Sequence, residues 1–97
     1  MKEEDFLAKY DAGEEFTEEE ISKSLFEFPE VHEEQGECHR WTQAMTTYIN
    51  VSGRLFRIDW MRGLTEDQED EYLDQPVEVR QKTYQKMVTV TEYIPVK

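Results

Sequence analysis

Hydrophobic residues near the start of the chain recur at the spacing of one helix face. Phe6 and Tyr10 would share a side of a helix over residues 2–10, and Gly13 would end it. The pattern therefore predicts a short N-terminal helix. It does not decide whether residues 1–15 are ordered or flexible in the free protein.

A second helix signal covers residues 16–28. Thr17 and Glu20 have the spacing of a capping box, in which each side chain bonds the other residue's exposed backbone N–H. Ile21 begins an apolar stripe at helical spacing, and Pro29 ends the helix because it has no N–H to donate. The sequence predicts a capped amphipathic helix that stops before the proline.

Between residues 40 and 60 the pattern changes to the alternation of β-strands. Ser52-Gly53 interrupts the alternation with a pair typical of a two-residue turn, which predicts a β-hairpin. Val51 then faces Arg54, and this register puts apolar and β-branched residues of both strands on one sheet face. The opposite face would be half wet.

An acidic stretch follows the hairpin. Thr65 and Gln68 repeat the capping-box spacing, and acidic residues continue almost to Leu73. This arrangement predicts a short acidic helix or helical turn, which Pro76 would close.

The last part of the chain, residues 77–96, is rich in residues that favour strands, but its alternation changes phase. A bulge or turn at residues 84–86 would explain the change. Residues 87–94 would then complete a three-stranded antiparallel sheet, with the helix of residues 17–28 on its apolar face. The predicted fold class is α+β, in a single small domain spanning residues 1–97.

Charge is segregated along the chain, whose net charge is -12. Residues 1–37 hold fourteen acids and three bases, and residues 65–78 hold seven acids and no base. Residues 38–64 and 79–97 each hold one acid and four bases. Such a field repels the phosphates of nucleic acid and favours a basic groove on another protein.

Residues with catalytic or metal-binding chemistry are few. His32, Cys38 and His39 match no zinc spacing, and adjacent residues of an extended segment point to opposite sides, which disfavours a Cys38–His39 dyad. Their segment reads as a polar linker before the hairpin. We expect no metal, no cofactor and no enzymatic activity.

No stretch has the apolar length of a signal peptide or membrane span, and a lone cysteine forms no internal disulfide. The expected location is therefore the cytoplasm, with no membrane partner.

Arginines and aromatic residues are interleaved in the middle of the chain. Arg40, Arg54, Arg57 and Arg62 lie among residues that could stack on bases. The flanking acidic blocks oppose direct contact with nucleic acid, so we expect these arginines to pair with acids of the same chain and the aromatics to fill the core.

The acidic blocks have two interpretations. One is a solvated surface that keeps the protein soluble. The other is mimicry, in which carboxylates imitate the phosphates of a nucleic-acid strand and occupy an arginine-rich groove. The candidate partner-binding residues are Glu18, Glu19, Glu20, Glu27, Glu66, Asp67, Glu69, Asp70, Glu71 and Tyr72.

The chain resembles small acidic proteins encoded in phages and prophages of Gram-positive bacteria. The likeness runs nearly end to end and is carried by residues 40–42, GRLFRIDW at 53–60 and GLTEDQEDEY at 63–72, continuing to residue 79. Some small acidic proteins from such neighbourhoods are anti-CRISPR proteins, which inhibit the RNA-guided nuclease of type II systems. The resemblance implies a stoichiometric inhibitor that occludes this nuclease, or its guide-loaded complex, in the host bacterial cell.

Two other function classes remain open. An oligomeric phage structural or regulatory protein without catalytic activity would pair an edge strand with a second copy, so a homodimer is one expected alternative. A small hydrolase or nuclease would need clustered carboxylates around a divalent ion, a geometry that sequence does not display.

Overall fold

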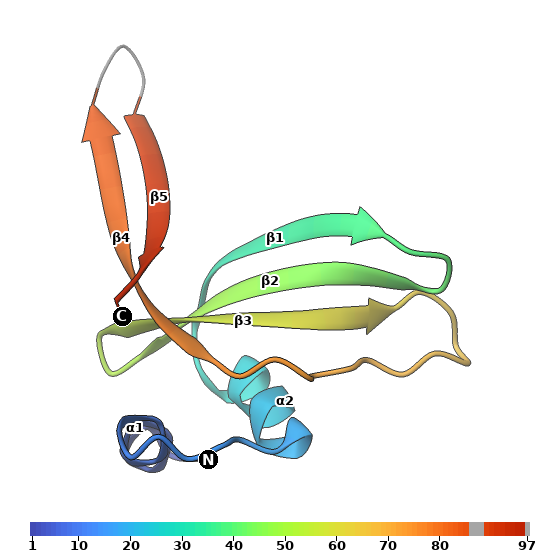
Figure 1. Cartoon of the computed structure of the whole chain (residues 1–97), viewed down its shortest axis with the longest axis horizontal. Coiled ribbons are helices and arrows are strands. Elements are labelled where there is room, and N and C mark those ends of the chain that lie inside the picture. Colours follow the sequence, from blue (N-terminus) through green and yellow to red (C-terminus); the bar gives the residue numbers. More distant parts are fainter. Residues whose placement is uncertain (86–88, 97) are drawn as a thin grey trace.

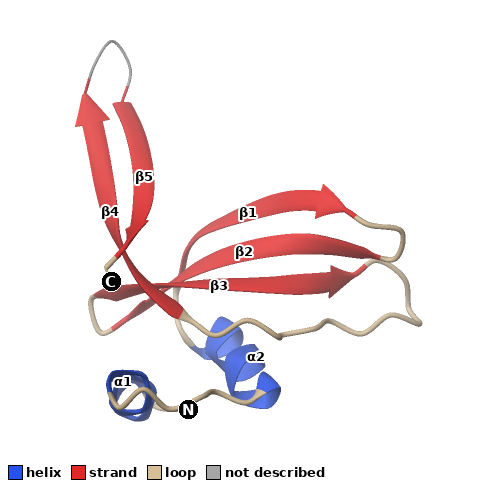
Figure 2. Ribbon diagram, in the orientation of Figure 1, coloured by secondary structure: helices blue, strands red, loops and turns tan. Residues whose placement is uncertain are grey.

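The computed structural model describes residues 1–85 and 89–96, and all statements about structure concern these residues. Both helices lie on one side of a single antiparallel sheet, whose strand order is β1-β2-β3-β4-β5 (Figures 1 and 2). The elements are α1 (Glu3–Asp11), α2 (Glu18–Glu27), β1 (Glu30–Cys38), β2 (Thr42–Val51), β3 (Arg54–Gly63), β4 (Val77–Gln85) and β5 (Thr89–Pro95). The α+β class is confirmed, with five strands where the sequence predicted three.

Both predicted helices form, and their ends have the expected causes. In α2 the Thr17 N–H donates to Glu20 Oε1 over 2.9 Å, and the Glu20 N–H donates to Thr17 Oγ1 over 3.2 Å, which completes the capping box. Phe28 is already extended, with ψ at 147°, as expected for a residue before proline. Gly13, just after α1, has a φ of 75°, which suits glycine.

The central hairpin has the predicted register. Val51 pairs with Arg54, and the pairing continues to Thr42 opposite Gly63. Ser52 and Gly53 have φ values of 53° and 86°, the left-handed conformation of a tight two-residue turn. Local turn chemistry and side-chain alternation agree in this part of the chain, and both are readable from sequence.

The helices and the hairpin enclose an aromatic core. Phe6 of α1 is fully buried, and its ring lies 4.9 Å from the rings of Phe16 and Phe56 and 5.4 Å from that of Phe28. The aliphatic members of the core are Ile21, Ile49, Val51 and Ile58. Burial of these side chains provides the main driving force for packing the helices on the sheet.

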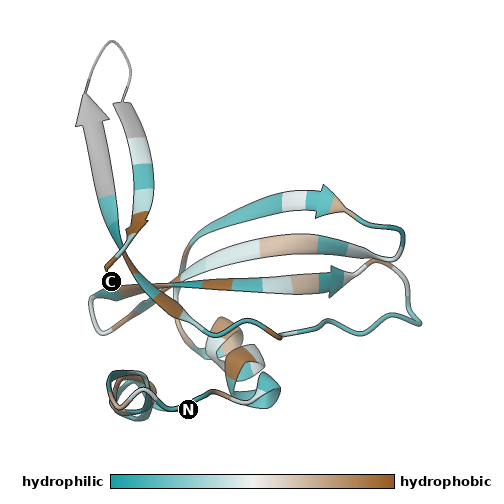
Figure 3. Cartoon of the chain, in the orientation of Figure 1, coloured by the Kyte–Doolittle hydropathy of each residue, from teal (hydrophilic) through white to brown (hydrophobic). Residues whose placement is uncertain are grey.

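Strand β1 corrects the prediction of a polar linker before the hairpin. Every residue of β1 is exposed, and Figure 3 shows its mostly hydrophilic colouring. No apolar alternation marks such a strand, because it is held by backbone pairing with β2 at the edge of the sheet. A bulge at Val31 shifts the register, since Glu30 pairs with Ile49 but His32 pairs with Tyr48.

The last two strands also differ from the prediction. Residues 87–94 were expected to form the third strand of the sheet, but Val77–Gln85 forms a further strand, β4, which pairs with β3, and β5 pairs with β4. The predicted bulge or turn at residues 84–86 and the start of the predicted strand fall partly on residues 86–88, outside the described residues. Pairing of β3 with β4 is short, and the β4–β5 hairpin projects from the rest of the sheet (Figure 1).

In the hairpin, the face opposite the helices is half wet as predicted, except at Tyr48. Only 4% of Tyr48 is exposed, because its ring stacks on Tyr93 of β5 at 4.1 Å and on His32 of β1 at 5.8 Å. The short alternation pattern of the hairpin contains no sign of this contact, which comes from a strand forty residues further along the chain.

Candidate acidic interface

The segment after β3, residues 64–76, is acidic and extended, and we call it the acidic segment. Of the two predicted forms of this segment, a short helix or a helical turn, the structure has a turn and no helix. A single turn closes where the Gln68 N–H donates to the Thr65 carbonyl over 3.1 Å, and Glu71 then pairs with Met61 of β3 through two backbone hydrogen bonds of 2.8 and 2.9 Å. These bonds hold the segment against the sheet, where a helix would lose them.

Gly63 makes the close return of the acidic segment possible. Its N–H donates to Asp70 Oδ1 over 2.9 Å, and a Cβ at this position would lie 2.2 Å from the Gln68 carbonyl oxygen. Only glycine leaves room for that backbone. Sequence reasoning missed this role of Gly63, and the available signal was a glycine three residues before the acidic run that begins at Glu66.

Replacing Gly63 with alanine is expected to displace residues 64–71 and to destabilise the protein by about 1–3 kcal/mol, because the backbone of Gln68 must move. Amide chemical shifts and urea unfolding measure the two effects. Gly36→Ala is the matched control, since its Cβ would meet the Ala44 Cβ at 3.2 Å and demands a smaller shift. Unchanged amide shifts at residues 64–71 in Gly63→Ala would contradict the proposed crowding.

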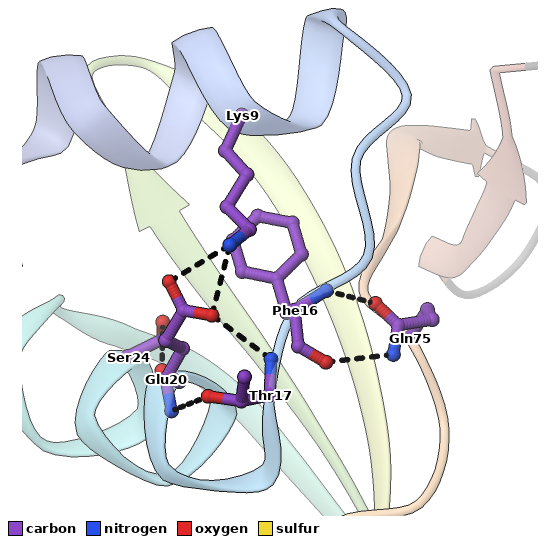
Figure 4. A network of polar contacts seen from close by, with 6 residues as sticks. All are labelled: Lys9, Phe16, Thr17, Glu20, Ser24 and Gln75. Atoms are coloured by element: carbon purple, nitrogen blue, oxygen red, sulfur yellow. Dashed lines mark hydrogen bonds and ion pairs between the residues drawn. The ribbon is translucent and has the colours of Figure 1, made fainter.

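Gln75 fixes the far end of the acidic segment to the helices. Its side-chain amide accepts from the Phe16 N–H over 2.7 Å and donates to the Phe16 carbonyl over 3.0 Å (Figure 4). This amide therefore occupies both backbone groups of the residue that precedes the α2 cap. The contact brings the acidic segment beside the first turn of α2.

The two acidic blocks meet in one open hollow of about 480 Å³, which we call the acidic hollow. Glu18 reaches it from the start of α2, and the acidic segment supplies the other walls. Its lining residues are Glu18, Asp67, Gln68, Glu69, Asp70, Glu71 and Leu73. Within residues 1–85 and 89–96, no ion pair neutralises any of these carboxylates. The hollow is thus a concentrated and uncompensated negative surface.

The remaining candidates from α2 lie outside the hollow. Glu20 accepts two hydrogen bonds from Lys9, at 2.9 and 3.1 Å, besides its cap bond (Figure 4). Glu19 forms an exposed ion pair with Lys23 at 3.1 Å, and Glu27 pairs with the N-terminal amine. These three carboxylates are already partnered.

Hydrogen bonding lowers the pKa of Glu20, first from the Thr17 backbone N–H and then from Lys9. The charged form therefore stabilises the fold above about pH 4.5, and this contribution is lost as pH falls through the lower folded-state pKa. Glu20→Gln keeps a cap acceptor but loses the charge, so it is expected to cost roughly 0.5–1 kcal/mol at pH 7. The difference from the parent in urea unfolding should shrink below about pH 4.5 and vanish once Glu20 is protonated in the folded state, and a constant difference across pH would exclude the ionic origin.

The two remaining candidate partner-binding residues, Glu66 and Tyr72, differ in how far they are exposed. Glu66 is exposed in the turn of the acidic segment. Tyr72 stacks on Trp60 of β3 at 5.5 Å, and its hydroxyl donates to Asp70 Oδ2 over 3.3 Å. Burial raises the pKa of the Tyr72 phenol, so this residue is partly enclosed rather than a free surface anchor.

Of the four arginines expected to pair with acids of the same chain, Arg54 and Arg57 do so. Arg54 binds Glu78 at 2.9 Å and Asp11 at 2.9 and 3.0 Å, and these contacts raise its pKa. Arg57 pairs with Asp59 of its own strand at 3.1 Å. Arg62 instead donates a hydrogen bond to the side-chain amide oxygen of Gln43. The Arg40 guanidinium lies over the neighbouring Trp41 ring, 4.9 Å from its centroid.

Among the described residues, no three His, Cys, Asp or Glu side chains are placed to hold one metal ion. Cys38 is an exposed free cysteine at the end of β1. No described helix has the length and apolar character needed to cross a membrane.

Comparisons with protein-family models, curated proteins and solved structures found no match to the chain.

Proposed function

We propose that this chain is an acidic inhibitor that binds a basic, nucleic-acid-binding surface of a nuclease and occludes it. The observation that carries the proposal is the acidic hollow, where Glu18 and the acidic segment gather uncompensated carboxylates. Arginines that grip nucleic acid bind carboxylates with similar geometry, because both ligands offer charged oxygen acceptors. No catalytic step is required of such a protein.

The proposed target is the RNA-guided nuclease of type II CRISPR systems, or its guide-loaded complex, in a bacterial host. This choice rests on the resemblance to small acidic phage and prophage proteins. A nuclease that holds nucleic acid in a positively charged channel offers the partner that the net charge of -12 favours.

The test is a panel of type II nucleases, each incubated with the protein before and after guide loading, with target DNA binding and cleavage measured separately. The proposal expects loss of target DNA binding at about 0.1 M salt, and expects the protein's own binding to the nuclease, measured without DNA, to be lost near 1 M, where the Debye length falls to about 3 Å. Loss of cleavage with DNA still bound would contradict occlusion. Absence of any effect across the panel would overturn the choice of target.

An oligomeric phage structural or regulatory protein is the second candidate, because the described sheet is open at β5. An unpaired strand edge permits pairing with a second copy, and β5 has only one acidic residue to oppose it. Multi-angle light scattering tests self-association. A dimer that inhibits no nuclease would favour this candidate over the inhibitor.

A further inference from the structure

A pocket of about 240 Å³ lies beside the acidic hollow, between α2 and the helix-facing side of the sheet. We call it the aromatic pocket. Its walls include Trp60 of β3, Tyr72 of the acidic segment and Thr47 of β2, and Phe26 of α2 lies at its edge with 83% of its surface exposed. The carboxylates of Glu30, Glu33 and Asp70 also line it, and none of the described residues that line it is basic.

The bulge in β1 places two of these carboxylates beside the aromatic walls of the pocket. Residues three apart in a regular strand point to opposite faces, but the extra residue at position 31 turns Glu30 and Glu33 to the same face. Both therefore join Asp70 in the pocket. Proximity has a visible consequence, since partial burial and the neighbouring Glu33 raise the pKa of Glu30.

Neutral donors hold the pocket in shape. The Trp60 indole N–H donates to Thr47 Oγ1 over 3.0 Å, and the Thr47 hydroxyl donates to Glu33 Oε2 over 3.2 Å. The Tyr72 ring stacks on Trp60 with 19° between the ring planes. These contacts orient the aromatic walls and leave the negative charge unneutralised.

We propose that the aromatic pocket receives one arginine side chain of the partner protein. A guanidinium stacks on aromatic faces and binds carboxylates through its planar fork of donors, and this pocket offers both groups. Its volume is below the roughly 300–1,000 Å³ of small-molecule sites, and it suits a single side chain. The identity of the donor protein rests on the proposed function, whereas the preference for a guanidinium does not.

The pocket is tested on the whole chain with Nα-acetyl-arginine amide as the probe, followed by the indole N–H resonance of Trp60. The expected result is a saturable shift at millimolar probe, a weaker one with the lysine analogue, and none with the citrulline analogue, which has nearly the same shape but no charge. A shift of equal size with citrulline, or no shift of Trp60 with arginine, would overturn the proposal. Trp41, exposed at the far end of the hairpin, reports non-specific binding.

Glu30→Gln combined with Glu33→Gln is expected to weaken arginine binding at least tenfold, since glutamine can still accept from Thr47 but carries no charge. Glu34→Gln is the matched control on the same strand, and its side chain faces the opposite side, with Thr46. Arginine binding that survives the double substitution would overturn the role of the carboxylates.

The nuclease panel separates this inference from the proposed function. If no nuclease binds the protein but the arginine probe still shifts the Trp60 resonance, the proposed nuclease target is wrong and the arginine-binding pocket is supported. If a nuclease binds the Glu30→Gln/Glu33→Gln variant as tightly as the parent, the aromatic pocket does not bind the nuclease. The proposal of an acidic inhibitor is then kept.

Discussion

Reversing Asp67, Glu69 and Glu71 of the acidic hollow to lysine together is expected to weaken binding to the target nuclease roughly a hundredfold, because attraction to a basic groove becomes repulsion. The fold should survive, since none of these three carboxylates has an ion pair or side-chain hydrogen bond with the described residues. Asp70 is left unchanged because it accepts from the Gly63 N–H. Affinity at two salt concentrations and far-UV circular dichroism measure binding and folding.

A control with the same change in total charge decides whether position matters. Glu14, Glu15 and Glu37 are exposed and lie outside the acidic hollow, so reversing them to lysine alters the net charge equally. We expect a much smaller effect on affinity, chiefly through slower association. Equal losses for the two triple variants would show that binding follows the overall field, and the assignment to the hollow would then be wrong.

Replacing Phe6 with alanine is expected to cost about 3–5 kcal/mol of stability, the range for truncating a buried phenylalanine. Its ring is fully buried and contacts three other aromatic rings of the core. A domain of this size has only about 5–15 kcal/mol of stability in total, so the variant should be largely unfolded or should lose the docking of α1. Urea unfolding gives the free energy, and limited proteolysis within residues 1–15 reports whether α1 detaches.

Phe26→Ala is the matched control, because this phenylalanine is 83% exposed and its truncation should change stability by less than about 0.5 kcal/mol. Similar urea midpoints for Phe6→Ala and the parent would mean that α1 contributes little to the core in solution. The question of order in residues 1–15, which the sequence leaves open, would then be answered as flexible.

Helix α2 and the central hairpin were predictable because their determinants are local. Thr17 and Glu20 satisfy each other's backbone groups within one turn, and that spacing is visible in the sequence. The Ser52-Gly53 turn and the alternation around it fix the register through neighbouring residues. The acidic candidate residues could also be listed from the sequence. The sequence could not show that Glu20 is bound by Lys9, whereas Glu18 has no ion pair with the described residues.

By itself, the sequence determined the α+β class, the two helices, the hairpin register and the strong negative charge, since each follows from composition or from residues close along the chain. Tertiary structure alone decided the rest. Strand β1 exists through backbone pairing that leaves no hydrophobic period. The acidic segment is extended because Gly63 binds the Asp70 side chain and Gln75 binds the backbone of Phe16, fifty-nine residues away in the sequence. The meeting of Glu18 with the acidic segment depends on those long-range contacts, which no local pattern encodes.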